Sequence, residues 1–437
     1  MRRFAMTAVS LLLAGCAAEA GTTNAPTGPA TSSTEMVAPT TTASGATSTT
    51  SSNAFRSMPD IAVVSSDGHV AVVHDGTFGP VQKGVLAADG SAVIVTTPSS
   101  VDGKATTRVV WQATQAGAEL GSVTLPGDLT AIATDASGKT VAFTAPNADA
   151  PAGTVLVVAT PEGEQFRHTY ASELQPEGFS NILLPGSAIP AGLFVIEYLD
   201  PPPVDQTAPR RYRVRVVDTA SGDLALPLDL RNKGQTVDEQ MLGFGRTHVL
   251  SRTNGLLFTL YRGLDSDEKG YAFVHTLGFV NGVYCLDLPE QLDLAELPGA
   301  VALLDDESKL AVVSANGTVS EFVINDITDP SRTPAPLRTV RAWDGASAVG
   351  PAVAAVGRTM LVGQGDSLRW IDSQSLAVDA VQHWDMGIEA VALRANGNAI
   401  AVGTGRVSEI TPHGQLAAEV PLPTAIGAVA RVVLLAG

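Results

Sequence analysis

From residue 58 onward, short apolar runs alternate with small polar turns. Segments such as "IAVVSSDGHVAVVHDG" and "LTAIATDASGKTVAFTA" place runs of β-branched and aliphatic residues between Asp-Gly or Ser-Gly pairs. Runs of this kind bounded by such dipeptides predict β-strands joined by tight hairpins. No long window shows the period of an amphipathic helix. The pattern therefore predicts an all-β domain over residues 58–437.

The predicted hairpin turns recur with a loose period of about fifty residues, which is typical of repeat architectures. Turns between the first two strands of each unit are predicted at Asp89-Gly90, Ser137-Gly138, Pro185-Gly186, Asn254-Gly255, Asp305-Asp306, Gly357-Arg358 and Asn396-Gly397. We expect left-handed backbone in these turns, including at Asp89 and Asn254. Each unit has room for four strands, as in one blade of a β-propeller. Two separate β-sandwiches are the alternative.

The two ends of this domain complement each other. "IAVVSSDGHVAVVHD" resembles the second half of a blade, and "AIGAVARVVLLAG" at the C-terminus resembles the first half. A ring hides its last strand edge when strands from both ends share one blade. We therefore predict a single β-propeller of four-stranded blades, closed by strands from both termini. Eight blades are favoured, and seven are the alternative.

The first 57 residues differ from the rest of the chain. Arg2 and Arg3 precede an apolar run, Phe4–Ala14, which fits a signal peptide and is too short to span a membrane. The following Leu13-Ala14-Gly15-Cys16 resembles the bacterial lipoprotein signal. The resemblance implies cleavage of residues 1–15 and lipidation of Cys16, including acyl chains such as palmitate. An ordinary signal peptide with an incidental cysteine is the alternative.

Residues 16–57 begin with the lipidated Cys16 and continue as a stretch rich in Ser, Thr, Pro, Ala and Gly. Such a stretch buries too little apolar surface to offset its ordering entropy, so we predict a disordered tether. The chain would hang from the extracytoplasmic face of the cell membrane. Cys285 is the remaining cysteine, which leaves no partner for an internal disulfide.

The formal net charge of the whole chain is −17. This acidic excess argues against nucleic acid as a partner and against an anionic lipid surface. Arginine greatly outnumbers lysine, and Ala, Gly and Val are abundant. That composition is typical of a GC-rich genome and predicts an actinobacterial host.

Segments between residues 175 and 290 carry a resemblance. "RYRVRVVDTASGD", "VDEQMLGFGRTHVLS", "LLFTLYRG" and "YAFVHTLGFVNGVYCLDLPE" resemble secreted actinobacterial proteins with WD40-like or YVTN-like propeller repeats. The resemblance implies a propeller at the cell envelope and transfers no activity. Trp343-Asp344 and Trp384-Asp385 fall between predicted blades, whereas the WD40 dipeptide ends a third strand. The polar network of that family is therefore not expected here.

Two groups of side chains are candidates for a binding site. Arg211, Arg213 and Arg215 share one face of a predicted strand, where they could bind an anion or pair with local carboxylates. His248 and His275 lie in one predicted blade and could ligate a metal together with Asp238 or Glu239, although no third ligand has a fixed spacing. We expect structural roles for both groups.

Three other features are weaker. Asp265–Gly270 begins like a calcium loop but has Lys269 at a ligand position. Gly365–Leu368 spells the GDSL hydrolase motif in a predicted hairpin, where we expect coincidence. The proline-rich loop 199–211 is the longest insertion and the expected contact surface. Cys285 is expected to be buried with Leu286 and Leu288.

These observations predict a monomeric cell-envelope lipoprotein whose propeller head binds or scaffolds a protein or glycan partner, without a cofactor. The alternative is a propeller enzyme, similar to a lactonase or quinone dehydrogenase, with a metal or cofactor at the central channel. An anchored assembly factor is a third possibility. Several carboxylate or histidine groups converging on the axis would favour the enzyme.

Overall fold

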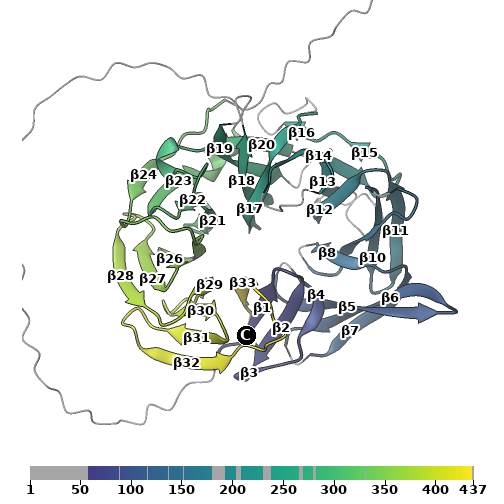
Figure 1. The fold of residues 1–437 in the computed structure, drawn as a ribbon, viewed down its shortest axis with the longest axis horizontal. Coiled ribbons are helices and arrows are strands. Elements are labelled where there is room, and N and C mark those ends of the chain that lie inside the picture. Colours follow the sequence, from purple (N-terminus) through teal and green to yellow (C-terminus); the bar gives the residue numbers. More distant parts are fainter. Residues whose placement is uncertain are drawn as a thin grey trace, which may run out of the picture.

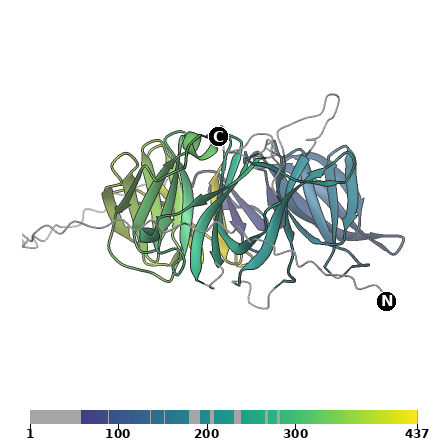
Figure 2. The ribbon, with the colours of Figure 1, turned by 90° about the horizontal axis from the view of Figure 1, so that it is seen from above.

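The computed structural model describes residues 58–435, except 88, 116, 136, 151, 180–191, 203–207, 230–237, 265–268, 279–281 and 330. In these residues, short strands form sheets arranged as a ring around a centre (Figure 1). Seen from above, the ring is a flat disc (Figure 2). The chain is a β-propeller, which confirms the predicted fold class. The predicted signal peptide, Cys16 and the tether lie outside the described residues.

Four of the six hydrogen-bonded sheets are four-stranded, antiparallel and built from strands consecutive in sequence. The first holds β8 (Thr130–Thr134), β9 (Val141–Pro146), β10 (Thr154–Thr160) and β11 (Gly163–Tyr170). The second holds β21 (Gly299–Leu304), β22 (Lys309–Ser314), β23 (Thr318–Val323) and β24 (Arg338–Arg341). The third holds β25 (Ala352–Val356), β26 (Thr359–Gln364), β27 (Ser367–Asp372) and β28 (Val378–His383). The fourth holds β29 (Ile388–Leu393), β30 (Ala399–Gly403), β31 (Arg406–Ile410) and β32 (Leu416–Pro421).

Two larger sheets complete the ring. The eight-stranded sheet contains β33 (Val429–Leu434), β1 (Ile61–Ser65), β2 (His69–His74), β3 (Thr77–Phe78), β4 (Gln82–Leu86), β5 (Ala92–Val101), β6 (Lys104–Ala113) and β7 (Glu119–Pro126). The nine-stranded sheet contains β12 (Glu173–Phe179), β13 (Gly192–Tyr198), β14 (Arg210–Asp218), β15 (Leu224–Ala225), β16 (Leu228–Asp229), β17 (Met241–Ser251), β18 (Leu256–Leu264), β19 (Gly270–Gly278) and β20 (Gly282–Asp287). A 3-10 helix (Glu290–Leu292) and α1 (Ile324–Thr328) are the helical elements among the described residues. Neither helix is long and apolar enough to cross a membrane.

Each larger sheet has the strands of two blades. The β2–β4 pair joins the halves of one sheet, and the β14–β17 pair joins the halves of the other. Dividing the sheets at these pairs gives units like the four-stranded ones. The hydrogen bonds run through both junctions, so the sheets alone do not separate these units into individual blades. The blade count of eight therefore stays a prediction.

The ends of the domain meet in one sheet. β33 pairs antiparallel with β1, with Ile61 opposite Leu434 and Val63 opposite Val432. Beyond this ladder, Leu435 donates its backbone N–H to the Asp60 carbonyl over 3.0 Å. The predicted closure by both termini is confirmed.

The predicted hairpin turns fall between the first two strands of their units, except that Pro185-Gly186 lies outside the described residues. The glycines adopt the left-handed backbone, with φ of 77° at Gly90 and 85° at Gly397. Asp89 and Asn254 do not, so that expectation was wrong. Asp89 instead accepts the Ser91 backbone N–H through its side chain, over 2.9 Å. Aspartate thus shapes this turn by a side-chain bond, while glycine supplies the positive φ.

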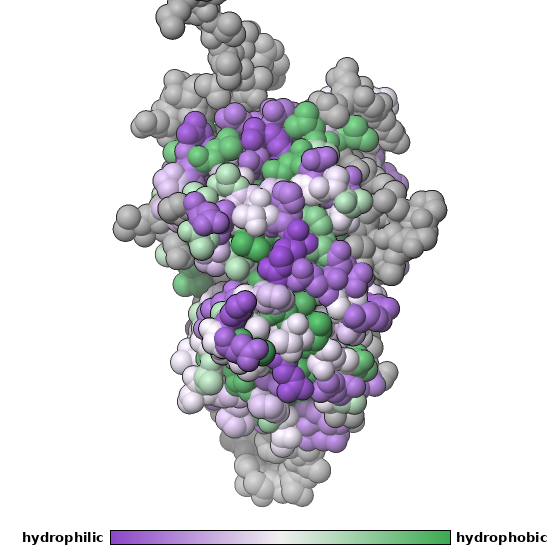
Figure 3. Space-filling view, turned by 90° about the vertical axis from the view of Figure 1, so that its right-hand side faces the viewer, coloured by the Kyte–Doolittle hydropathy of each residue, from purple (hydrophilic) through white to green (hydrophobic). Residues whose placement is uncertain are grey.

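The apolar core lies between neighbouring sheets, so many strands are buried on both faces. Leu310 and Val312 of β22 are fully buried, as are Leu361 and Val362 of β26. Double-sided burial explains the near-continuous apolar runs of the sequence. The outer face of the ring mixes hydrophilic and hydrophobic residues where β6, β7 and β11 lie (Figure 3).

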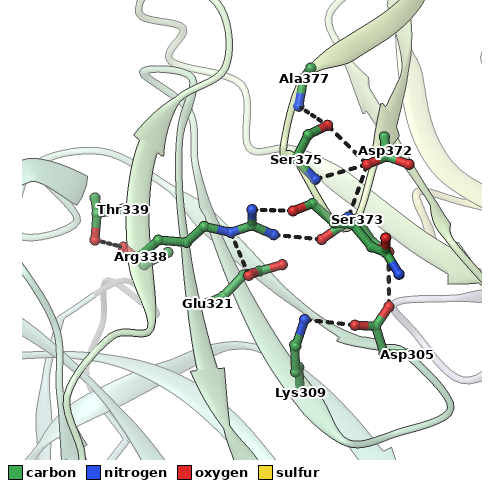
Figure 4. Close-up of polar contacts among 11 residues, drawn as sticks. Asp305, Lys309, Glu321, Arg338, Thr339, Asp372, Ser373, Ser375 and Ala377 are labelled. Atoms are coloured by element: carbon green, nitrogen blue, oxygen red, sulfur yellow. Dashed lines mark hydrogen bonds and ion pairs between the residues drawn. The ribbon is translucent and has the colours of Figure 1, made fainter.

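Hydrogen bonds and ion pairs also join neighbouring sheets, and we call the set around Arg338 and Ser373 the polar lock (Figure 4). The fully buried Glu321 of β23 receives the Arg338 Nε–H over 2.7 Å, and Arg338 also donates to the Ser373 carbonyl, 2.7 Å away in the next sheet. Asp305 accepts the Ser373 hydroxyl over 2.9 Å and pairs with Lys309 over 2.7 Å. These bonds fix one blade against the next.

Candidate functional site

The strands nearest the centre differ strongly in character. In Figure 1 these include β8, β12, β17, β21, β29 and β33. The sequences of β21 (GAVALL) and β25 (AVAAV) are small and apolar, whereas β12 (ELQPEGF) and β17 (MLGFGRTHVLS) carry charged side chains. Charged side chains on the inner strands therefore come mainly from β12, β17, β29 and β33.

Several inner strands contain a one-residue bulge. In each of these strands one residue has no partner in the ladder of the neighbouring strand. The unpaired residues are Ile132 in β8, Glu177 in β12, Arg246 in β17, Glu389 in β29 and Ala430 in β33. A bulge bends its strand and re-aims the extra side chain. The period-two pattern of the sequence gives no signal for these bulges.

Two bulge residues bond to the backbone that leads into the next inner strand. Glu389 accepts the Val429 backbone N–H over 2.7 Å, and Arg246 donates to the Leu297 carbonyl. Both bonds run around the ring from one blade to its neighbour. The bulges thus help to position the inner strands.

The inner strands β17 and β33 lie on opposite sides of the centre of the ring (Figure 1), and both carry basic residues. We define the axial cluster as His248 of β17, Arg252 of the turn after it, and Arg431 of β33. All three residues are exposed to solvent. The surrounding protein nevertheless desolvates two of them. Desolvation lowers the pKa of His248, and the Arg431 charge lowers it further. Surrounding protein and then the Arg252 charge lower the pKa of Arg431. This combination is expected for exposed side chains that have other protein groups close by.

Glu177, the bulge residue of β12, has a different environment. Surrounding protein raises its pKa to about 8, while a hydrogen bond from Gln175 opposes the rise. Gln175 also accepts the Tyr198 hydroxyl over 3.0 Å. The Glu177 charge in turn contributes to the raised pKa of Tyr261, whose ring stacks on Tyr212. Glu177 is therefore largely protonated at neutral pH.

The arginine stripe of β14 is paired with local carboxylates. Arg211 binds Asp200 over 2.6 Å, Arg213 binds Glu197 over 2.7 Å, and Arg215 binds Asp238 over 2.6 Å. These partners occupy the guanidinium groups. The structural role expected for this stripe is supported, and the anion site is not found there.

His248 and His275 do not converge. Both lie opposite Thr259 of the intervening β18, so one strand separates them. Two strand spacings amount to about 10 Å, too far for one metal ion. His275 is buried, and burial lowers its pKa to about 4. Among the described residues, no three His, Cys, Asp or Glu side chains lie close enough to hold a metal.

The GDSL segment brings together a serine, a histidine and an aspartate. Ser367 Oγ lies 3.2 Å from His383 Nδ1 and donates to Asp366 over 3.0 Å. The same His383 nitrogen faces Asp366 at 3.6 Å, whereas a catalytic triad presents one imidazole nitrogen to the serine and the other to the acid. Ser367 is also buried. This contact is a cross-strand pair within β27 and β28 rather than a nucleophile.

The other predicted residues can be placed in part. Asp265–Glu268 of the calcium-like segment and residues 203–207 of the long loop lie outside the described residues, as does Cys16. Cys285 is only partly buried on β20, and its Sγ lies 3.7 Å from Met241 Sδ. Leu286 is fully buried, whereas Cys285 and Leu288 pack against the core with partial exposure, so the predicted interior placement holds fully for Leu286 alone.

The WD dipeptides lie between sheets, as predicted. The guanidinium of Arg369 lies 5.0 Å from the centre of the Trp343 ring, and that of Arg406 lies 5.4 Å from the Trp384 ring centre. Both arginines come from the third strand of the following sheet. The tryptophans therefore serve packing between strands in this protein.

No protein-family model matches the chain, and no curated protein matches it in sequence. Solved structures match its fold. "Dihydro-heme d1 dehydrogenase NirN in complex with DHE" has a TM-score of 0.48 at 12% identity, with 87% of this chain and 76% of that chain covered. Saccharomyces cerevisiae Sqt1 has a TM-score of 0.45 at 11% identity, covering 75% and 81%. BamB from Moraxella catarrhalis has a TM-score of 0.39 at 11% identity, covering 81% and 93%. At these values no activity or partner transfers.

Proposed function

We propose that this chain is a cell-envelope lipoprotein whose β-propeller head is a binding or scaffold module for a protein or glycan partner. The axial cluster carries the binding proposal. His248, Arg252 and Arg431 are solvent-exposed, and none of their side chains forms a hydrogen bond or ion pair with a described residue. Their polar groups are therefore available to a ligand.

The scaffold around the cluster is preorganised. The ring is closed by the β1–β33 ladder, and interblade bonds such as Arg338 to Ser373 hold its sheets together. A rigid surface loses little conformational entropy when a partner binds. This rigidity supports a recognition role for the loops and strand ends on the two faces of the disc.

In-cell crosslinking tests the binding role. A photo-crosslinking residue placed at Arg252 should capture a defined envelope protein or glycan, because this position is exposed beside the axis. A matched probe at Asp102, an exposed turn residue between β5 and β6 on the outer side of the ring (Figure 1), should not capture the same molecule. Identical products from both positions, or none from Arg252, would contradict recognition at the axis.

The lipid anchor is the second part of the proposal and is supported by the sequence around Cys16. Cys16→Ser should release the head into the medium or leave an uncleaved precursor, because the acylated thiol is lost. Membrane fractionation followed by mass measurement checks this result. Cys285→Ser is the matched control and should leave membrane association unchanged. An unaltered membrane fraction of Cys16→Ser would show that the anchor assignment is wrong.

An enzyme with a metal or cofactor at the channel is the alternative function. Glu177 favours it, because a carboxyl group with a pKa of about 8 can donate a proton at neutral pH. The described residues supply no set of three metal ligands, so we derive no step through a metal. Loss of a measured activity in Glu177→Gln, with folding retained, would favour this alternative over binding alone.

A further inference from the structure

The unpaired arginines of this acidic protein gather in one region. Among the residues that the structure describes, most arginines form an ion pair with Asp or Glu. The exceptions are Arg246, Arg252, Arg262, Arg369 and Arg431. Arg369 lies over the Trp343 ring and Arg246 over the Phe244 ring, so each has an aromatic partner. Apart from Arg369, these arginines belong to β17, the turn that follows it, β18 and β33.

The charges of this group lower one another's pKa values. Between β33 and the β17 segment, the Arg431 charge lowers the pKa of His248 and the Arg252 charge lowers that of Arg431. On the adjacent strands β17 and β18, the Arg262 charge lowers the pKa of Arg246. β33 and β17 are separated by most of the chain, yet they face each other at the centre of the ring (Figure 1). The closure of the propeller therefore brings together positive groups from its two opposite sides.

No Asp or Glu side chain of the described residues forms an ion pair with this group. Arg246 uses one nitrogen on the Leu297 carbonyl, and the buried Nε of Arg262 has no hydrogen-bond partner among the described residues. Two carboxylates beside the group bond to other residues instead: Glu389 accepts the Val429 backbone N–H, and Glu307 accepts the Ser251 hydroxyl and the Thr253 backbone N–H. Like charges held together in a partly desolvated space destabilise a protein unless an anion compensates them.

We propose that the axial cluster is a binding site for an oxyanion group, a carboxylate or a phosphate, which is held between Arg431 of β33 and the His248–Arg252 segment. The planar guanidinium of arginine binds such groups through paired N–H donors. His248 supplies a further ring nitrogen as a hydrogen-bond donor. The proposal rests on the binding function above and names the chemistry of the ligand.

Titration of the full-length chain with inorganic phosphate and, separately, with acetate tests this site. Both are titrated at constant ionic strength against sodium chloride, with calorimetry and thermal unfolding as readouts. One or both anions should bind the wild-type chain and raise its melting temperature relative to chloride. The two arms distinguish a phosphate group from a carboxylate. Binding of neither anion above the chloride baseline would overturn the proposal.

Substitutions then locate the site. Arg431→Gln should weaken anion binding by roughly tenfold or more, the loss expected for one charge-assisted hydrogen bond. Arg108→Gln, which removes an exposed arginine that pairs with Glu119 on outer strands, should bind as the wild type does. Equal affinity in both variants would place the anion elsewhere and contradict the proposal.

The melting temperature without ligand separates a binding role from a structural one. Arg431→Gln removes a cation that has no partner among described residues, so the unliganded variant should melt at the same temperature as the wild type or higher. A structural arginine would show the opposite. Arg252→Gln gives a second variant with the same expected pattern, should the first fold poorly. Anion binding without a crosslinked partner in cells would contradict the wider proposed function and leave this site standing.

Discussion

Two arcs of the ring achieve interblade packing in different ways. The C-terminal arc, β21–β32, consists of three separate four-stranded sheets with short strands and small apolar inner strands. The central arc, β12–β20, is one nine-stranded sheet with strands of up to 11 residues, a paired arginine stripe and a tyrosine cluster. The regular arc is typical of a structural repeat. The irregular arc places charged groups at the axis, where they are available for recognition.

Breaking the polar lock of the C-terminal arc should have the largest effect. Arg338→Ala should lower the free energy of unfolding by about 3–5 kcal/mol, because it leaves the fully buried Glu321 without its partner. Chemical denaturation of the purified chain measures this loss. Arg341→Ala on the same strand is the control, since its partner Asp344 is almost fully exposed, and it should cost less than about 1 kcal/mol. Equal losses would show that the lock is not stabilising.

The buried histidine of the central arc should give the second-largest effect. The pKa of His275 is about 4 in the folded chain and about 6.5 when unfolded, so the unfolded chain binds more protons between these values. Stability should therefore fall by about 3 kcal/mol as the pH drops from 6.5 to 4. His275→Leu should flatten this dependence in denaturation curves. The exposed His383→Gln should keep it, and an unchanged slope in His275→Leu would refute the assignment.

Glu177 should produce a dependence of the opposite sign within the same arc. Its folded pKa of about 8 lies above the unfolded value of 4.5, so its contribution is complete below pH 4.5 and is lost as the pH rises to 8. Because Glu177 keeps partial solvent exposure, which screens the full shift, Glu177→Gln should gain only about 2 kcal/mol over the wild type between pH 4 and pH 8. Glu119→Gln, at an exposed ion pair, should gain nothing. If both variants follow the wild-type pH curve, Glu177 is not buried in the way described.

A turn in the C-terminal arc should give the smallest effect. Asp305, Asp306 and Glu307 all have positive φ where other blades have glycine. Asp306 is exposed, so Asp306→Gly should relieve backbone strain and stabilise the chain by about 0.5–1 kcal/mol. Gly397→Asp, the reverse change at the matching turn, should destabilise it by a similar amount. Thermal unfolding distinguishes these signs, and destabilisation by Asp306→Gly would contradict the strain argument.

The two arcs also show what sequence can predict. Turn dipeptides and apolar runs predicted the strands and the position of nearly every first hairpin, because these features depend on residues close in sequence. The closure was predicted from the complementary half-blades at the two ends of the domain. Pairing of Arg211 with Asp200 was anticipated only as one of two possibilities. The axial cluster was missed because it joins His248 to Arg431 through closure of the ring. The bulge at Glu177 was missed because no local pattern marks an unpaired residue.

The pairing of β1 between β2 and β33 has a mechanical consequence. Any force transmitted along the polypeptide from residues before Met58 enters the head through β1. Because β1 is hydrogen-bonded along both edges, a pull parallel to it loads two ladders in shear, and their bonds share the tension. The head would therefore resist extraction at the point where a membrane attachment would pull on it.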